Sequence, residues 1–206
     1  MMSGGKDSFL SAVIAIEQGL ELEKALIVKP SEYSYMFHFP NVLYATETAS
    51  LLDLEYEFVD EAHFERKISE LAGEGLNAIV SGAIASEYQK TRIERLCTAN
   101  KIVSFTPLWK IDQERIIREI INAGIRAMIV SVSAEGLGEQ DLGKEINLPY
   151  LDHLKSLEKR YGINISGEGG EYESFVFGYG SKVKRVQGHR VWSGSGGYFI
   201  IDRIES

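Results

Sequence analysis

The sequence predicts an α/β protein with a doubly wound parallel sheet and a small β-rich annex at its C-terminal end. Three observations lead to this class. Helix-like and strand-like segments alternate as far as Gly162. The strand-like segments are short, continuous apolar runs, as in strands that helices cover on both faces. Beyond Gly162, strand-like runs separated by glycines replace the helical periodicity. We therefore expect an α/β domain over residues 1–162 and the annex over residues 163–206.

Each expected helix combines apolar residues at three- and four-residue spacing with a cap or a glycine at its end. The expected helices cover residues 9–19, 41–52, 61–72, 87–100, 112–124 and 150–161. The expected strands of the α/β domain cover residues 25–28, 56–59, 78–80, 102–105 and 127–132. Those of the annex cover residues 175–177, 183–191 and 198–201. Right-handed crossovers between parallel strands would place helices on both faces of the sheet.

Composition excludes several classes of protein. Apolar residues make up 44% of the 206 residues, enough for an ordinary core, so we do not expect disorder. No apolar run approaches the roughly 20 residues that cross a bilayer, and no signal-peptide pattern opens the chain. The single cysteine excludes an internal disulfide framework and indicates a reducing, cytoplasmic location.

The net charge of −8 makes nucleic acid an unexpected partner, because binding to phosphate backbones usually requires a basic balance. A local basic cluster lies near the C-terminal end. It comprises Lys182, Lys184, Arg185, His189 and Arg190. A solvated face of a hairpin accounts for this cluster better than a nucleic-acid site does.

The segment Ser3-Gly4-Gly5-Lys6-Asp7-Ser8 opens the first helix. Its glycines let the backbone approach an anion, and the helix N-terminus presents N–H groups and a favourable dipole to phosphates. The serines add hydroxyl donors and Lys6 a positive charge. Asp7 would repel phosphate unless a cation lies between them, so we expect Mg²⁺ at Asp7. Ordinary N-capping after a mobile start is the alternative.

This segment lacks the Walker A spacing but resembles the PP-loop of the ATP pyrophosphatase superfamily, S-G-G-x-D-[ST]. A phosphate loop at a strand–helix turn requires a strand in front of it, and only Met1 and Met2 precede Ser3. We therefore expect the functional protein to have a short apolar strand before Ser3, encoded upstream of Met1 or supplied otherwise.

Further stretches narrow the resemblance to one family, the diphthine–ammonia ligases. They are 34–41 (SYMFHFPN), 81–95 (SGAIASEYQKTRIER), 107–109 (PLW), 130–137 (VSVSAEGL) and 167–174 (GEGGEYES). The resemblance spans about residues 3–176, and the last stretch is its most distinctive part. It implies an adenine-nucleotide alpha-hydrolase-like, Rossmann-like fold. It also implies that ATP adenylates the carboxylate of diphthine on translation elongation factor 2, and that ammonia then displaces AMP.

The resemblance and the positions of strand ends together indicate nucleotide-binding residues. Gly82 follows a strand, where open α/β sheets bind ligands. On the next helix, Tyr88, Gln89 and Arg92 are further candidates for ATP contact. A capping box formed by Ser86 and Gln89, and a solvated face at Arg92, remain sufficient structural explanations.

The acidic glycine-rich stretch provides the candidates for the ammonia step. Glu168, Glu171 and Glu173 could bind Mg²⁺, hold ammonium or remove a proton from it. We expect this stretch to be flexible and to close over the acyl-adenylate; a mobile, solvated turn is the alternative. His38 is not expected to be catalytic, because a lone histidine before a helix is more often packed or capping.

Two competing functions remain open. One is a different PP-loop adenylating enzyme that modifies tRNA, and the other is a nucleotide-binding module without turnover. Sulfur-transfer relatives commonly need paired cysteines, whereas Cys97 stands alone and lies at core spacing from Ile93. Releasing ammonia from glutamine would need a nucleophilic thiol and another domain, so we expect free ammonium as the nitrogen donor.

Overall fold

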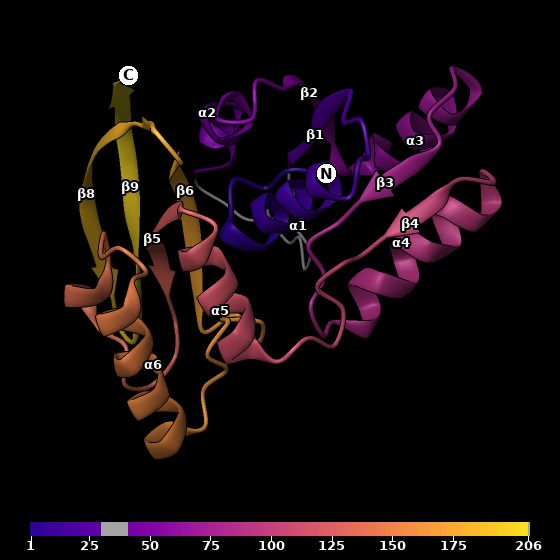
Figure 1. Ribbon diagram of the computed structural model, residues 1–206. Coiled ribbons are helices and arrows are strands. Elements are labelled where there is room, and N and C mark those ends of the chain that lie inside the picture. Colours follow the sequence, from indigo (N-terminus) through magenta and orange to yellow (C-terminus); the bar gives the residue numbers. More distant parts are fainter. Residues whose placement is uncertain (30–40, 206) are drawn as a thin grey trace. The chain divides into compact units, whose positions relative to one another are not determined.

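The computed structural model describes residues 1–29 and 41–205 (Figure 1). The chain forms two compact units. The first comprises Met1–Ser3 and Asp7–Lys110, and the second comprises Gly4–Lys6 and Ile111–Ser206. The division therefore passes through the glycine-rich segment at the start of the chain.

The first unit contains two pairs of parallel strands. Strand β1 (Lys24–Lys29) pairs with β2 (Glu55–Asp60), and β3 (Ala78–Val80) pairs with β4 (Val103–Phe105). Its helical elements are α1 (Lys6–Glu17), η1 (Asn41–Tyr44), α2 (Ala45–Ser50), η2 (Glu61–His63), α3 (Phe64–Gly73) and α4 (Glu87–Ala99). This alternation of strands and helices is the one that the sequence predicts.

A core of aliphatic and aromatic side chains holds the first unit together. Four consecutive residues of β1 are buried, as expected for a strand that is covered on both faces. Two of them, Leu26 and Val28, pack with residues from α3 and α4. The buried members of this core are Leu26, Val28, Val59, Phe64, Ile68, Ile79, Ile93 and Cys97.

The second unit is built on an antiparallel sheet with the strand order β7-β6-β5-β9-β8. Its strands are β5 (Ile125–Val132), β6 (Tyr172–Tyr179), β7 (Lys182–Val183), β8 (Arg185–Ser193) and β9 (Gly196–Glu205). The helical elements are α5 (Gln113–Asn122), η3 (Glu139–Asp141) and α6 (Leu148–Tyr161). Ile116, Ile117 and Ile120 of α5 are fully buried, so α5 contributes a continuous apolar face to this unit's core.

Several boundary predictions are confirmed. Asp112 accepts a hydrogen bond from the Arg115 N–H at the start of α5 (2.9 Å), and Ser86 accepts one from Gln89 at the start of α4 (3.3 Å). Gly162 ends α6 in the left-handed conformation, with φ of 72°. Asn41 begins the short turn η1 instead of capping a long helix, and α2 starts at Ala45.

Strand β5 differs from its expected place. The sequence places residues 127–132 in the parallel sheet, but β5 pairs antiparallel with β6 and β9. Accordingly, the compact units divide between Lys110 and Ile111 and not at residue 162. A strand at the centre of an antiparallel sheet that helices cover has the same continuous apolar sequence as a buried parallel strand. The sequence pattern alone therefore does not identify the strand's partners.

Within residues 1–29 and 41–205, no helix combines the length and apolar character that a membrane crossing requires.

Candidate active site

In the first unit, the two serines of the segment Ser3–Ser8 contact each other. The Ser3 N–H donates to the Ser8 hydroxyl (3.2 Å), and the two side-chain oxygens are 3.1 Å apart. The Ser8 hydroxyl also lies 3.7 Å from the sulfur of Met2. These contacts fix a short turn at the start of α1, where the helix N-terminus favours an anion.

Gly82 lies directly against this turn, as the position of the strand end predicts. A Cβ atom on Gly82 would come 2.6 Å from the Ser8 N atom and 2.7 Å from the Asp7 carbonyl carbon. Both of these are backbone atoms, which cannot move aside as a flexible side chain can. The backbone after β3 can therefore approach the start of α1 only because residue 82 has no side chain.

The same region contains a buried hydroxyl without a hydrogen-bond partner among the described residues. Ser81 is only 5% exposed, and its Oγ finds no acceptor or donor in that part of the chain. Buried polar atoms are normally satisfied, so one left open beside a helix N-terminus indicates space for a polar ligand. Together with the cradle at Gly82, this arrangement fits the phosphate groups of a nucleotide.

In the second unit, Lys6 contacts both ends of the acidic loop at residues 167–174. Lys6 is 2% exposed, and its Nζ atom donates to the Ser166 carbonyl (2.5 Å) and lies 5.1 Å from the centre of the Tyr172 ring. Its backbone N–H donates to the Ser174 hydroxyl (3.2 Å). The sequence predicts a charge that reaches phosphate, whereas these contacts favour a structural role for Lys6 in the second unit.

Gly4 adds a second link of this kind. The Val176 N–H on β6 donates to the Gly4 carbonyl (2.8 Å), and Gly4 has a positive φ of 85°. A side chain is disfavoured in that conformation, so the glycine is needed for the turn itself.

The acidic loop is held by one of its own carboxylates. Glu171 accepts hydrogen bonds from the backbone N–H and side-chain amide of Asn164 (2.9 and 2.5 Å) and from the Gly169 N–H (2.8 Å). A carboxylate with three such donors stabilises the loop. The expected catalytic role of Glu171 is therefore less well supported than a structural one, and these three hydrogen bonds favour a held loop over a mobile turn.

Gln113 holds the residues that lead into this loop, and the sequence did not predict this role for Gln113. Its Nε2 donates to the side-chain Oδ1 of Asn164 (2.9 Å), and its Oε1 accepts from both the N–H and the hydroxyl of Ser166 (3.0 Å each). A lone glutamine at the start of a helix carries no recognisable signal. Only the fold shows that it faces residues about fifty positions further along the chain.

Glu168 and Glu173 remain the carboxylates with candidate chemical roles. Both are half-buried; Glu168 lies in the loop, and Glu173 lies on β6 opposite Ser131 of β5. The predictions that these two residues handle ammonium stay predictions.

The predicted nucleotide contacts on α4 are not equally supported. The guanidinium of Arg92 lies 3.3 Å from a Glu61 carboxylate oxygen and 3.5 Å from one of Glu65. Two carboxylates already neutralise it, so these ion pairs favour the structural explanation for Arg92. The Gln89 N–H donates to Ser86, which caps the helix as described above, and Tyr88 is 59% exposed.

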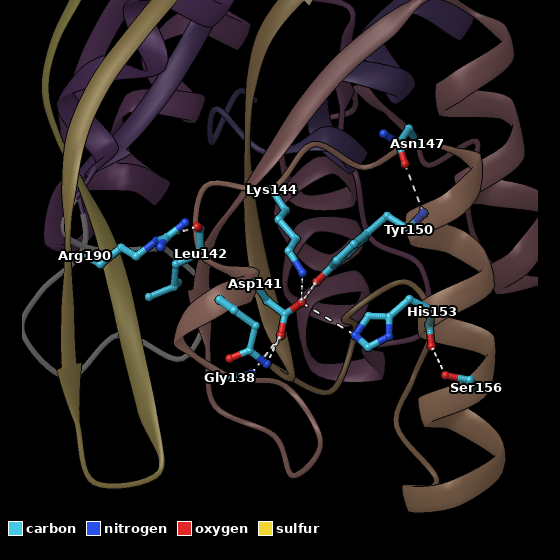
Figure 2. Close-up of polar contacts among 10 residues, drawn as sticks. Gly138, Asp141, Leu142, Lys144, Asn147, Tyr150, His153, Ser156 and Arg190 are labelled. Carbon is cyan, nitrogen blue, oxygen red and sulfur yellow. Dashed lines mark hydrogen bonds and ion pairs between the residues drawn. The ribbon is translucent and has the colours of Figure 1, made fainter.

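Another polar cluster, in the second unit, centres on the fully buried carboxylate of Asp141 (Figure 2). Sequence reasoning also missed this cluster. The Asp141 Oδ2 atom accepts a hydrogen bond from the Gly138 N–H (2.9 Å). The Oδ1 atom of Asp141 accepts from the hydroxyl of Tyr150 (3.3 Å) and from the ammonium of Lys144 (3.4 Å). His153 Nε2 lies 3.6 Å from the same oxygen. Burial and the negative charge of Asp141 both raise the pKa of Tyr150, so its hydroxyl stays protonated and remains a donor.

This cluster fixes the loop that runs beside β5. The Ile129 N–H donates to the Lys144 carbonyl (2.8 Å), and the Gly143 N–H donates to the Ile129 carbonyl (2.8 Å). From β8, the Arg190 guanidinium donates to the Leu142 carbonyl (3.0 Å), as Figure 2 shows. Asp141 therefore has a structural role in the second unit.

Cys97 is buried at 2% exposure, as expected from its spacing. Burial raises the pKa of its thiol, which keeps it protonated and a poor nucleophile. The aromatic stretch 34–40, including His38, lies outside the described residues.

The fold and this site define a mixed α/β protein with a glycine-rich turn at the start of its first helix. The chain belongs to the diphthamide synthase family. The family model of the N-terminal domain matches residues 1–103, and that of the C-terminal domain matches residues 112–206. The two matches leave a gap at 104–111, which includes the division between the two compact units.

Named relatives agree with this family. A human protein named diphthine–ammonia ligase is 32% identical over 207 residues, covering 85% of this chain and 76% of the human protein. The zebrafish protein of that name is 27% identical over 204 residues, covering 85% and 80%. The fission yeast protein is 29% identical, and the match covers 90% of this chain but 35% of the longer yeast protein.

A solved structure, titled as a predicted subunit of tRNA methyltransferase from Methanocaldococcus jannaschii, matches with a TM-score of 0.48 and 16% identity. The match covers 89% of this chain and 97% of that one. A similarity at this level carries no argument about function.

Proposed function

We propose that this protein is the ATP-dependent ligase that converts diphthine on translation elongation factor 2 into diphthamide with ammonium. The diphthamide synthase family, and relatives named diphthine–ammonia ligase, support a ligase that uses ATP and acts on a protein. In this reaction the carboxylate of diphthine attacks the α-phosphate, pyrophosphate leaves, and ammonia displaces AMP from the acyl-adenylate.

One observation carries the nucleotide part of the proposal. The backbone at Gly82 lies against Asp7 and Ser8, so close that a Cβ atom would reach 2.6 Å from the Ser8 N atom. Ligands of open α/β sheets bind at the carboxyl ends of the parallel strands, and Gly82 follows the carboxyl end of β3. Backbone N–H groups fixed at a helix N-terminus would stabilise the charge that develops on the leaving pyrophosphate.

Asp7 is the residue that we propose for Mg²⁺. A carboxylate beside bound phosphates is repelled unless a cation lies between them, and Mg²⁺ prefers one or two carboxylates together with phosphate oxygens. We expect Asp7→Asn to raise the Mg²⁺ concentration needed for half-maximal activity by about tenfold, a loss of about 1.4 kcal/mol. Mg²⁺ titrations at saturating ATP measure this, and an unchanged requirement would contradict the assignment.

The acidic loop is proposed for the second step. Ammonium is a cation and is unreactive until it loses a proton, so a half-buried carboxylate could both attract and deprotonate it. Glu168 and Glu173 are the candidates, because Glu171 is engaged in holding the loop. We expect Glu168→Gln and Glu173→Gln to retain acceptor-dependent exchange of labelled pyrophosphate into ATP and to form little amide. Wild-type amidation by both variants would remove the loop from the chemistry.

The overall proposal is tested by mixing the protein with ATP, ammonium and elongation factor 2 that carries diphthine. We expect AMP and pyrophosphate to appear together, and mass spectrometry to show the amide on the acceptor. A factor with unmodified histidine is the matched control, and it should release no AMP. If AMP release does not depend on the acceptor, the ligase proposal is wrong.

A further inference from the structure

Strands β8 and β9 form a long hairpin at one side of the antiparallel sheet of the second unit (Figure 1). Two large apolar side chains lie directly opposite each other on this hairpin, Val191 of β8 and Tyr198 of β9. Val191 is 43% exposed and Tyr198 is 44% exposed. Residues that lie opposite each other in an antiparallel pair direct their side chains to the same face. Val191 and Tyr198 therefore form one exposed apolar pair, which no step of the proposed reaction uses.

A row of paired residues leads across the sheet from this apolar pair to Glu173. Tyr198 lies opposite Ser131 of β5, and Ser131 lies opposite Glu173 of β6. All four side chains are therefore on one face of the sheet. Neighbouring strands are about 4.8 Å apart, so Tyr198 lies about 10 Å from Glu173 along this row. A protein that covers the apolar pair has to extend one side chain over only that distance to reach Glu173.

The hairpin is basic, although the chain as a whole is acidic. Residues 182–205 contain five lysines and arginines and two acidic residues, whereas the whole chain has a net charge of −8. Strand β8 itself has two arginines, a histidine and no acidic residue. The apolar pair therefore lies within a positively charged part of the molecule, which attracts a negatively charged partner.

The position of the charges argues against a second copy of this chain as the partner. Strand β8 is the last strand of the sheet in the described part of the chain. A twofold dimer brings the same surface of each copy together, so Arg185 and Arg190 would approach the arginines of the other copy. Charged residues on an edge strand oppose such pairing.

The apolar pair also argues against nucleic acid. Binding to a phosphate backbone depends on basic side chains and makes no use of an exposed valine. Protein–protein interfaces, by contrast, combine an apolar centre enriched in tyrosine with a polar rim in which arginine is common. The combination of Val191, Tyr198 and the arginines of the hairpin fits a protein partner with an acidic surface.

We propose that the face of β8 and β9 around Val191 and Tyr198 is the docking surface for the protein acceptor, which binds it through an apolar side chain surrounded by carboxylates. The docked acceptor extends its modified side chain past Tyr198 and Ser131 and presents its reacting carboxyl group at Glu173. This inference rests on the proposed function, because it takes the acceptor to be the protein that is amidated.

Two substitutions of opposite charge at Val191 test the surface. Lysine and glutamate are both disfavoured in strands, so Val191→Glu and Val191→Lys cost similar stability and differ mainly in the sign of the new charge. The assay is amide formation with elongation factor 2 that carries diphthine as the varied substrate. We expect Val191→Glu to raise the KM for the acceptor by about tenfold or more, and Val191→Lys by about threefold or less. The KM for ATP should not change in either variant.

Two further variants extend this test to the other apolar residue and to a control position. Tyr198→Thr keeps a residue that favours strands and removes the aromatic ring, and we expect it to raise the KM for the acceptor by about tenfold. Leu148, at the start of α6 in the same unit, is 51% exposed. Leu148→Glu adds the same charge as Val191→Glu and should leave the KM for the acceptor unchanged.

Four results would overturn the docking surface while the wild type amidates the factor. They are an unchanged KM in both Val191→Glu and Tyr198→Thr, an equal rise in Val191→Glu and Val191→Lys, a wild-type dimer that Val191→Glu dissociates in sedimentation, and tight tRNA binding at physiological salt that Val191→Glu abolishes. The second result would mean a structural role for Val191, the third a second copy and the fourth a nucleic acid. A wild type that does not amidate the factor would instead refute the proposed function, and the docking surface with it.

Discussion

The phosphate turn and the acidic loop are both short and rich in glycine, but different forces shape them. In the first unit, the turn at Asp7 and Ser8 depends on a missing side chain, because the backbone of Asp7 and Ser8 occupies the space that a Cβ atom on Gly82 would need. In the second unit, the loop is held by polar side chains, with Glu171 accepting three hydrogen bonds and Gln113 making three more. One segment is thus sterically defined and the other is defined by hydrogen bonds.

This difference determines how each segment responds to substitution. A steric constraint between backbone atoms is lost with one added methyl group, since neither backbone can retreat without moving its helix or strand. A hydrogen-bonded clamp weakens by degrees, because each lost bond costs a fraction of the total. Substitutions in the two segments should therefore separate nucleotide binding from stability.

The largest effect is expected at Gly82. Its replacement by alanine places a methyl group 2.6 Å from the Ser8 N atom, so the turn must shift. Overpacking of this kind costs about 1–3 kcal/mol, and we expect ATP affinity to fall about 10- to 100-fold in titration calorimetry. Gly73→Ala is the matched control, because a Cβ atom there meets nothing within 4 Å. Equal ATP affinity in the two variants would show that the approach of Gly82 is unimportant for the nucleotide.

A moderate effect, on stability, is expected at Glu171. In Glu171→Gln the side-chain NH₂ group would face N–H donors of Asn164 and Gly169, where the carboxylate now accepts their hydrogen bonds. We expect the free energy of unfolding to fall by about 1–3 kcal/mol in urea titrations, with ATP affinity unchanged.

Glu135→Gln is the matched control for Glu171→Gln, because it removes the same charge from an exposed position of the second unit. Its effect should stay within about 0.5 kcal/mol. If Glu171→Gln is as stable as the wild type but forms no amide, Glu171 takes part in the reaction. The comparison between the two loops would then be wrong.

The sequence predicts local features well where a local cause determines them. Asp112, Ser86 and Gly162 cap their helices because the responsible contacts lie within a few residues. The position of Gly82 beside the start of α1 follows from the general rule that parallel strands bring their carboxyl ends together. Neither kind of prediction requires knowledge of distant partners.

Partners that lie far apart in the sequence could not be predicted in this way. The apolar run of β5 identifies a buried strand, but its antiparallel pairing with β6 and β9 depends on segments that follow α6 in the chain. Lys6 has a charge and a position in the sequence that suit contact with phosphate, yet its ammonium donates a hydrogen bond to the Ser166 carbonyl. In each case the residue type is compatible with two environments, and only the fold selects one of them.

The smallest effect is expected at Arg92, where the sequence and the structure lead to different predictions. A cation beyond a strand end suggests contact with phosphate, but the guanidinium already lies within 3.5 Å of carboxylates from both Glu61 and Glu65. Ion pairs of this partly exposed kind are worth about 0–1 kcal/mol, so Arg92→Gln should lower stability only slightly. We expect its ATP affinity to remain within about twofold of the wild type, and equal to that of Arg95→Gln, the exposed control on the same helix. A loss of more than about tenfold, confined to Arg92→Gln, would mean that nucleotide binding draws Arg92 away from its two carboxylates. The nucleotide site would then include α4 as well as the turn at Ser3–Ser8.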